Sequence, residues 1–158
     1  MTEHGFIRAV HKYLPPDIFR WKIHDTFAGG VPDAFYAGPA STLFVEYKYV
    51  KTLPKRDASL LRTSLSPQQK HWLNTLSDFH HPAALIIGCE KLALIMKNKA
   101  WNAEPSRAQF LLQAVTFSEV AKWIESICFQ GMIKDSDELE LNARSSAKPA
   151  TYLESKKV

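Results

Sequence analysis

Asp33, Glu46 and Lys48 are three charged residues in a stretch of sequence that is otherwise mostly aliphatic and aromatic. The stretch contains two strand-like segments, residues 31–37 and 42–50, which are joined by a turn with a Gly-Pro pair. Because successive side chains of a strand point to opposite faces, Glu46 and Lys48 share one face and lie roughly 6.6 Å apart along the strand. If the two strands pair antiparallel, Asp33 comes near Glu46. The sequence therefore predicts two carboxylates and an ammonium group at one place on a sheet.

Two carboxylates in a dry setting repel each other and resist ionisation unless a cation lies between them. Mg²⁺ and Mn²⁺ prefer oxygen ligands, and they bind one or two carboxylates while water and substrate phosphate complete the coordination. We therefore expect Asp33 and Glu46 to hold Mg²⁺ or Mn²⁺, with the backbone carbonyl of Tyr47 as a further ligand. Lys48 would orient or help deprotonate the attacking water, or balance charge on the phosphate. The alternative is an Asp–Lys–Glu ion-pair network with a structural role alone.

A helix at the start of the sequence would bring a third carboxylate to this place. Thr2 is a suitable N-cap, and Glu3 lies on the same stripe of the predicted helix as its apolar residues. We expect Glu3 to bind a second metal ion or to hold a metal-bound water. The alternative is a first-turn acid that the helix dipole favours. We expect the pair Pro15-Pro16 to end this helix.

The remaining elements predict an α/β domain with a mixed sheet and helices on its faces. Both faces of the segment 42–50 are largely apolar, which favours a central strand. Ser66 followed by Pro67 is typical of a helix start. The other expected elements are a basic loop over residues 51–65, strands over residues 83–88, 92–97 and 109–115, a helix capped by Ser118 that ends at Gly131, and a polar, mobile tail over residues 134–158.

The excess positive charge of the chain, +4 over 158 residues, lies within one stretch. Residues 46–70 contain six basic and two acidic residues, a difference of +4, and the basic and acidic residues elsewhere are equal in number. A basic stretch beside buried acids predicts a nucleic-acid partner, although an ordinary solvated loop is the alternative. The cations that we expect to contact phosphate are Lys51, Lys55, Arg56, Arg62 and Lys70.

Apolar runs in the sequence are all far shorter than the ~18 residues of a membrane span, and the first residues do not resemble a signal peptide. We therefore expect a soluble cytoplasmic protein with no membrane partner. Cys89 and Cys128 are isolated in apolar contexts, which favours free buried thiols over a disulfide. The Cys and His residues show no zinc spacing.

Two short motifs resemble the signature of the PD-(D/E)XK nuclease superfamily: "GVPD" at residues 30–33 and "EYK" at residues 46–48. The segment "LSPQQKHWLNTL", residues 65–76, is similar to the VRR-NUC (virus-type replication-repair nuclease) branch of that superfamily. The resemblance covers residues 2–96. It implies a restriction-endonuclease-like core, with a central mixed sheet flanked by helices, as the domain over residues 1–133.

The resemblance also implies a role for each matched residue. Asp33 and Glu46 would be metal ligands, Lys48 the catalytic lysine and Glu3 the acid of the first helix. Gln69 would be the family's glutamine after the catalytic strand, where it could hold a water or a phosphate. The alternative for Gln69 is a polar residue that belongs to the helix start alone.

The function that the resemblance implies is metal-dependent endonuclease activity on DNA phosphodiester bonds, with Mg²⁺ or Mn²⁺ and no small-molecule cofactor. The expected substrates are structured or branched DNA, such as Holliday junctions or flaps, because stand-alone domains of this kind resemble bacterial and phage nucleases related to Holliday-junction resolvases. A homodimer would be needed for two symmetrical cuts in a four-way junction. The alternative is a nucleic-acid-binding module of the same fold that does not cut.

Overall fold

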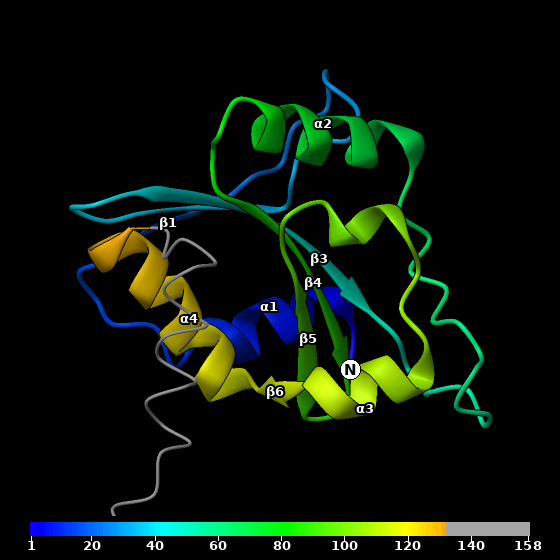
Figure 1. Cartoon of the computed structure of the whole chain (residues 1–158). Coiled ribbons are helices and arrows are strands. Elements are labelled where there is room, and N and C mark those ends of the chain that lie inside the picture. The colour runs from blue at the N-terminus through cyan, green and yellow to red at the C-terminus, as the bar shows by residue number, and fades with distance from the viewer. Residues whose placement is uncertain (132–158) are drawn as a thin grey trace, which may run out of the picture.

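The computed structural model describes residues 1–131, which form a six-stranded mixed sheet with helices on both faces (Figure 1). The strand order is β1-β2-β3-β4-β5-β6, and β3 and β4 are parallel while the other neighbouring strands are antiparallel. The predicted α/β architecture is therefore confirmed, whereas the predicted tail, residues 134–158, lies outside the described residues. The elements are α1 (Glu3–His11), β1 (Phe19–Lys22), β2 (Ala34–Ala37), β3 (Thr42–Tyr49), α2 (Pro67–Asp78), β4 (Ala83–Cys89), β5 (Leu92–Met96), the 3-10 helix η1 (Ala100–Asn102), α3 (Arg107–Gln113), β6 (Val115–Thr116) and α4 (Phe117–Gln130).

Strand β3 lies between β2 and β4, as expected for a segment with two apolar faces. It pairs antiparallel with β2, and Ala34 lies opposite Val45. The next pair in this register is Asp33 and Glu46, so the antiparallel pairing brings the two acids together as predicted. β3 then continues in parallel with β4, where Glu46 lies opposite Leu85.

The two faces of the sheet carry separate apolar cores. One core lies beneath α1 and α4 and includes Tyr47, and the other lies beneath α2 and α3 and includes Leu85. The edge of the Phe6 ring in α1 packs on Tyr47, with 5.4 Å between the ring centroids. Gly88 of β4 leaves room for this ring, because a Cβ there would lie 2.8 Å from it. Helix α1 therefore lies close against β3 and β4.

Helix α1 begins at Glu3 as predicted, because the side chain of Thr2 accepts a hydrogen bond from the backbone N–H of Gly5 at 3.1 Å. Ile7 and Val10 are buried, which confirms the predicted apolar stripe. The helix ends at His11, four residues before the Pro15-Pro16 pair that we expected to end it.

Two expectations about the second half of the chain are wrong. Residues 109–113 belong to helix α3 rather than to a strand, because Ser106 caps the helix by accepting from Gln109 N–H at 3.1 Å. Of the predicted strand, only Val115 lies in one, the short strand β6. The N-cap of α4 is Thr116 rather than Ser118, because Thr116 and Glu119 form a capping box. The apolar residues of "FLL" do not alternate as in a half-buried strand: Phe110 is buried and the two leucines are exposed.

Strand β1 forms one edge of the sheet and was not predicted. Its side chains are all exposed, including the large rings of Phe19 and Trp21. Phe19 contacts Phe35 of β2, whose ring in turn lies 5.0 Å from that of Phe44 of β3. This aromatic row lies on the sheet face that also carries Glu46, because register partners share a face.

Within residues 1–131, no helix is long and apolar enough to cross a membrane. Cys89 and Cys128 are both buried free thiols, which confirms that prediction.

Candidate metal and nucleic-acid site

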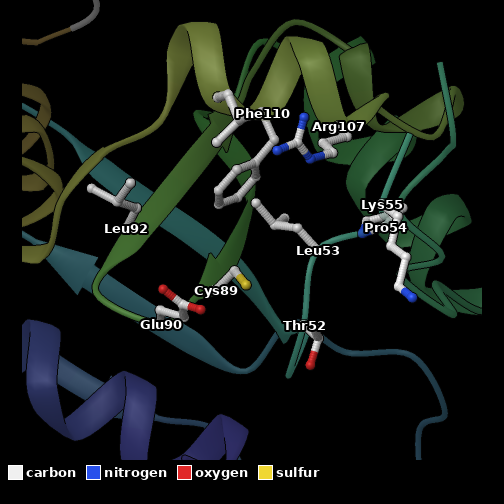
Figure 2. Close-up of a pocket in the computed structure, with 10 residues that line it drawn as sticks. Thr52, Leu53, Pro54, Lys55, Cys89, Glu90, Leu92, Arg107 and Phe110 are labelled. Carbon is white, nitrogen blue, oxygen red and sulfur yellow. The ribbon is translucent and has the colours of Figure 1, made fainter. Parts of the chain in front are cut away.

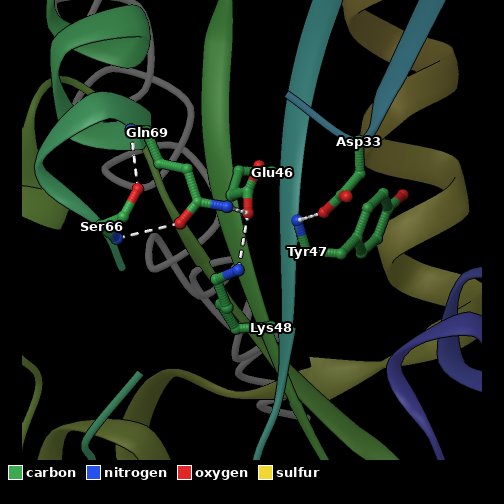
Figure 3. A network of polar contacts seen from close by, with 6 residues as sticks. All are labelled: Asp33, Glu46, Tyr47, Lys48, Ser66 and Gln69. Carbon is green, nitrogen blue, oxygen red and sulfur yellow. Dashed lines mark hydrogen bonds and ion pairs between the residues drawn. The ribbon is translucent and has the colours of Figure 1, made fainter. Parts of the chain in front are cut away.

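Asp33, Glu46, Lys48 and Gln69 form the cluster that we call the charged site (Figure 3). The ammonium nitrogen of Lys48 lies 2.7 Å from Oε1 of Glu46, and the side-chain amide of Gln69 donates to the same oxygen. The Glu46 side chain is 1% exposed and that of Lys48 is 15% exposed. Glu46 and Lys48 therefore share one face of β3, as the alternation of the sequence predicts.

Gln69 reaches Glu46 because the start of α2 fixes the position of its side chain. Ser66 N–H donates to Oε1 of Gln69 at 2.9 Å, and Gln69 N–H donates to the Ser66 hydroxyl at 3.2 Å. These two bonds form a capping box, which leaves the amide nitrogen of Gln69 free to donate to Glu46. Gln69 therefore belongs both to the helix start and to the charged site.

Gly30 brings the chain against the start of α2. Its φ is +82°, and a Cβ at this position would lie 2.6 Å from the carbonyl carbon of Gln68 and 2.8 Å from the backbone nitrogen of Gln69. Only glycine adopts this conformation readily and permits so close an approach. The "GVPD" motif thus contacts α2 through its glycine, three residues before its aspartate.

Asp33 lies immediately before β2 and binds the backbone of β3. Its Oδ2 accepts a hydrogen bond from Tyr47 N–H at 2.8 Å, and its backbone carbonyl accepts one from Ile23 N–H at 2.8 Å. The carboxylate is half-buried and lies beside the residue between Glu46 and Lys48. Asp33 and Glu46 therefore meet where β2 begins to pair with β3.

The ring of Tyr47 anchors the charged segment of β3 from the opposite face of the sheet. It is fully buried, and its hydroxyl lies 2.7 Å from that of Tyr36. The Tyr36 hydroxyl also lies 2.7 Å from Nε2 of His11, at the end of α1. This chain of three polar side chains holds β3 against α1, and we did not predict it from the sequence.

The charges of the site perturb one another. Burial, with a contribution from Asp33, raises the pKa of Glu46 to about 7. Burial lowers the pKa of Lys48, but the bond to Glu46 and the charges of the nearby acids outweigh it, so the net pKa is raised. Burial also raises the pKa of Glu3, which is close enough to feel Lys48 and Asp33. Glu3 is half-buried, and we find no hydrogen bond that joins it to the charged site.

The donor atoms of the charged site fit a divalent cation. Oε2 of Glu46 is buried and has no hydrogen-bond partner among residues 1–131, although Oε1 has two. A buried carboxylate oxygen without a partner is costly, and a cation would satisfy it while it neutralised the repulsion from Asp33. Within residues 1–131, no three His, Cys, Asp or Glu side chains are arranged to hold a metal. Two carboxylates are nevertheless enough for Mg²⁺, which keeps water or phosphate as its other ligands.

The predicted phosphate-contacting cations lie mainly on the long loop between β3 and α2. Lys51, Lys55, Arg56 and Arg62 are exposed there, whereas Lys70 is half-buried in α2. The segment 51–65 is a loop as predicted, and Leu61 anchors it in the core.

A pocket of about 420 Å³ lies between this loop, the β4–β5 turn and α3 (Figure 2). Its walls include Leu53, Lys55 and Phe110 but none of the four residues of the charged site. Arg107, which also lines the pocket, already pairs with Asp57. The pocket is therefore separate from the charged site.

Sequence reasoning placed Asp33, Glu46 and Lys48 together but missed the segment that precedes them. Residues 24–30 had no periodic pattern, so the approach of Gly30 to α2 was not foreseen. The Gly-Gly pair was the available signal, because glycines mark positive φ angles and close backbone contacts.

Known proteins resemble this chain in structure rather than in sequence. No family model matches the chain, and no curated protein matches it in sequence. A similar solved structure is that of Hjc, a Holliday junction resolvase from the archaeal hyperthermophile Archaeoglobus fulgidus, with a TM-score of 0.49 and 16% sequence identity. The likeness covers 77% of this chain and 97% of the Hjc chain.

Proposed function

We propose that this protein is a metal-dependent endonuclease that hydrolyses phosphodiester bonds in DNA. The observation that carries the proposal is Oε2 of Glu46, which is buried and unpaired among residues 1–131. Glu46 lies next to Asp33, and its other oxygen, Oε1, lies 2.7 Å from the ammonium nitrogen of Lys48. In an ion-pair network with a structural role alone, a buried carboxylate oxygen is as a rule hydrogen-bonded. The proposal rests on the side chains of the charged site and on their match to the PD-(D/E)XK signature.

Asp33 and Glu46 would hold Mg²⁺ or Mn²⁺, together with the carbonyl of Tyr47, and Glu3 would hold a metal-bound water from the side of α1. The metal, when bound, supplies an activated water and offsets charge on the attacked phosphate. Lys48, whose pKa is raised by its bond to Glu46, would act as a hydrogen-bond donor and a positive charge beside the attacked phosphate. Gln69 would keep the Glu46 carboxylate in place.

The substrate that we propose is DNA with a branched or otherwise interrupted structure, such as a four-way junction or a flap. The exposed cations of the loop between β3 and α2 would bind its phosphates, starting three residues after Lys48. A four-way junction would require a homodimer, because one charged site cuts one strand. The resemblance to the PD-(D/E)XK signature also leads us to expect a bacterial or phage origin.

The decisive experiment is a cleavage assay on four-way junction, flap, nicked and linear DNA with Mg²⁺ or Mn²⁺. Wild type should cut at least one branched substrate in the presence of metal and none in its absence. Lys48→Ala should lose at least about 100-fold in rate while it still binds DNA, because it removes charge stabilisation of the transition state. Lys122→Ala, which removes an exposed lysine of α4, is the matched control and should cut normally.

Cleavage without metal, or full activity of Lys48→Ala, would refute the proposal. DNA binding without cleavage by wild type under any metal condition would instead support the alternative, a nucleic-acid-binding module on the same fold.

A further inference from the structure

Phe27 is the most exposed large hydrophobic side chain among residues 1–131. Its relative exposure is 101%, so no other part of the described structure covers its ring. An exposed aromatic ring is unfavourable in water, and burying it against a partner would recover that free energy. The whole ring of Phe27 is therefore available to a partner.

The loop that carries Phe27 has a defined shape. Oδ1 of Asp25 accepts hydrogen bonds from the backbone N–H groups of Phe27 at 2.7 Å and Ala28 at 3.0 Å. The bond from Ala28 and then that from Phe27 lower the pKa of Asp25, so its carboxylate is charged at neutral pH. Further along the loop, after Phe27, Gly30 lies against the start of α2. The ring is thus presented by a loop that is held on both sides.

The loop limits the distance between Phe27 and the charged site. Figure 1 shows the connection between β1 and β2 rising beside α2. Gly30 follows Phe27 by three positions, which spans at most about 11 Å of chain. Gly30 contacts Gln69, whose side chain binds Glu46. A DNA strand bound at the charged site would therefore have Phe27 within a few base steps, since one step rises about 3.4 Å.

We propose that Phe27 is a wedge that stacks on an exposed base at the branch point of the DNA. This inference rests on the proposed function and deepens it, because it names the side chain that would recognise an interrupted base stack. Apolar side chains that enter DNA insert between base steps or cap an open stack in this way. Continuous duplex offers no free base face, so stacking there first requires two base pairs to be separated.

The surroundings of the ring favour DNA over a protein partner. The neighbours of Phe27 in the loop are Asp25, Thr26, Ala28 and Gly29, which are polar or small. One ring buries at most about 250 Å², whereas a stable protein interface needs about 800 Å² on each side. A single base is matched in size to one phenylalanine ring, and such stacking needs no further apolar surface.

The test uses a junction with 2-aminopurine at the branch point, in EDTA and in the Lys48→Ala background, so that no cleavage occurs. Binding should increase the 2-aminopurine fluorescence, because the ring of Phe27 separates the probe from its neighbouring base. Phe27→Ala should lose most of this increase and bind the junction about 5- to 100-fold more weakly, whereas Phe27→Trp should retain both. Leu112→Ala, which truncates another highly exposed side chain, is the matched control and should behave like the parent protein.

The wedge would be overturned if Phe27→Ala gave the same fluorescence increase as the parent protein. It would also be overturned if Phe27→Ala lost as much affinity for continuous duplex as for the junction. A change of oligomeric state in Phe27→Ala, measured by sedimentation, would also overturn it, because the ring would then belong to a protein interface. The readout needs neither metal nor cleavage, so a failed wedge and a failed nuclease give different results.

Discussion

Replacing Gly30 by alanine tests whether the "GVPD" motif positions α2 over the charged site. The backbone φ of +82° would place the new residue in the left-handed region, which costs about 1–2 kcal/mol for a residue with a Cβ. The Cβ would also lie 2.6 Å from the carbonyl carbon of Gln68, where ordinary contacts begin at 3.4 Å. The start of α2 or the loop must therefore move by about 0.8 Å, the difference between these distances.

This movement should affect both stability and cleavage. Overpacking of this kind costs roughly 1–3 kcal/mol, so the total loss of unfolding free energy should be about 2–5 kcal/mol. The shift would pull Gln69 away from Glu46, and a misplacement of about 1 Å near a reacting group can reduce the rate about 100-fold. Urea unfolding followed by circular dichroism measures the loss of unfolding free energy, and single-turnover cleavage of a junction measures the loss of cleavage rate.

Gly131→Ala provides the matched control. Gly131 has a φ of +80°, but no atom of residues 1–131 lies within 4 Å of its would-be Cβ, so only the backbone strain remains. Its φ of +80° and ψ of 178° are adopted almost only by glycine, so the variant should lose about 1–3 kcal/mol of unfolding free energy and retain normal cleavage. If Gly30→Ala is no less stable than Gly131→Ala, the close contact with α2 does not exist. If folded Gly30→Ala cleaves at the wild-type rate, the position of Gln69 is unimportant for the reaction.

Three further predictions concern the polar chain beneath β3 and the basic loop. Tyr36→Phe should lower the unfolding free energy by about 1–3 kcal/mol, because the buried Tyr47 hydroxyl loses its partner. Burial, with Arg20 and Lys22, lowers the pKa of His11 to about 4, below its ordinary 6.5. As the pH falls, His11 is therefore protonated in the unfolded chain before it is protonated in the folded chain. The unfolding free energy should fall by up to about 2 kcal/mol as the pH drops from 6.5 to 4, allowing for the partial exposure of the ring. An equal fall in His11→Gln, measured by urea unfolding, would contradict that origin. Lys55→Gln should reduce the slope of log affinity for DNA against log salt by about 1, measured by fluorescence anisotropy, and Lys122→Gln should leave it unchanged.

The charged site was predictable from the sequence because it depends on local periodicity. The alternation along β3 places Glu46 and Lys48 on one face, and a simple hairpin then brings Asp33 to them. The pattern Ser66-Pro-Gln-Gln69 indicates a capping box, but periodicity does not reveal that the free end of Gln69 reaches Glu46. That contact depends on how α2 packs, which is a tertiary property.

The errors have a common physical origin in short or aperiodic segments. Residues 109–115 contain an apolar run too short to distinguish a strand from a helix, and the cap at Ser106 decided the outcome. The loop around Phe27 has no apolar pattern, so its exposure and its approach to α2 emerge only from the folded structure. The edge strand β1 has charged and aromatic residues in equal number and buries none of them.

The most direct measurement is the response of the unfolding free energy to Mn²⁺. A cation held by Asp33 and Glu46 binds the folded chain alone, so Mn²⁺ at 100 times its dissociation constant should stabilise wild type by about 2.7 kcal/mol. Asp33→Asn and Glu46→Gln should lose most of this stabilisation, whereas Glu125→Gln, which neutralises an exposed acid of α4, should retain it. Equal stabilisation of all four proteins by Mn²⁺, or none in wild type, would contradict a metal site between Asp33 and Glu46.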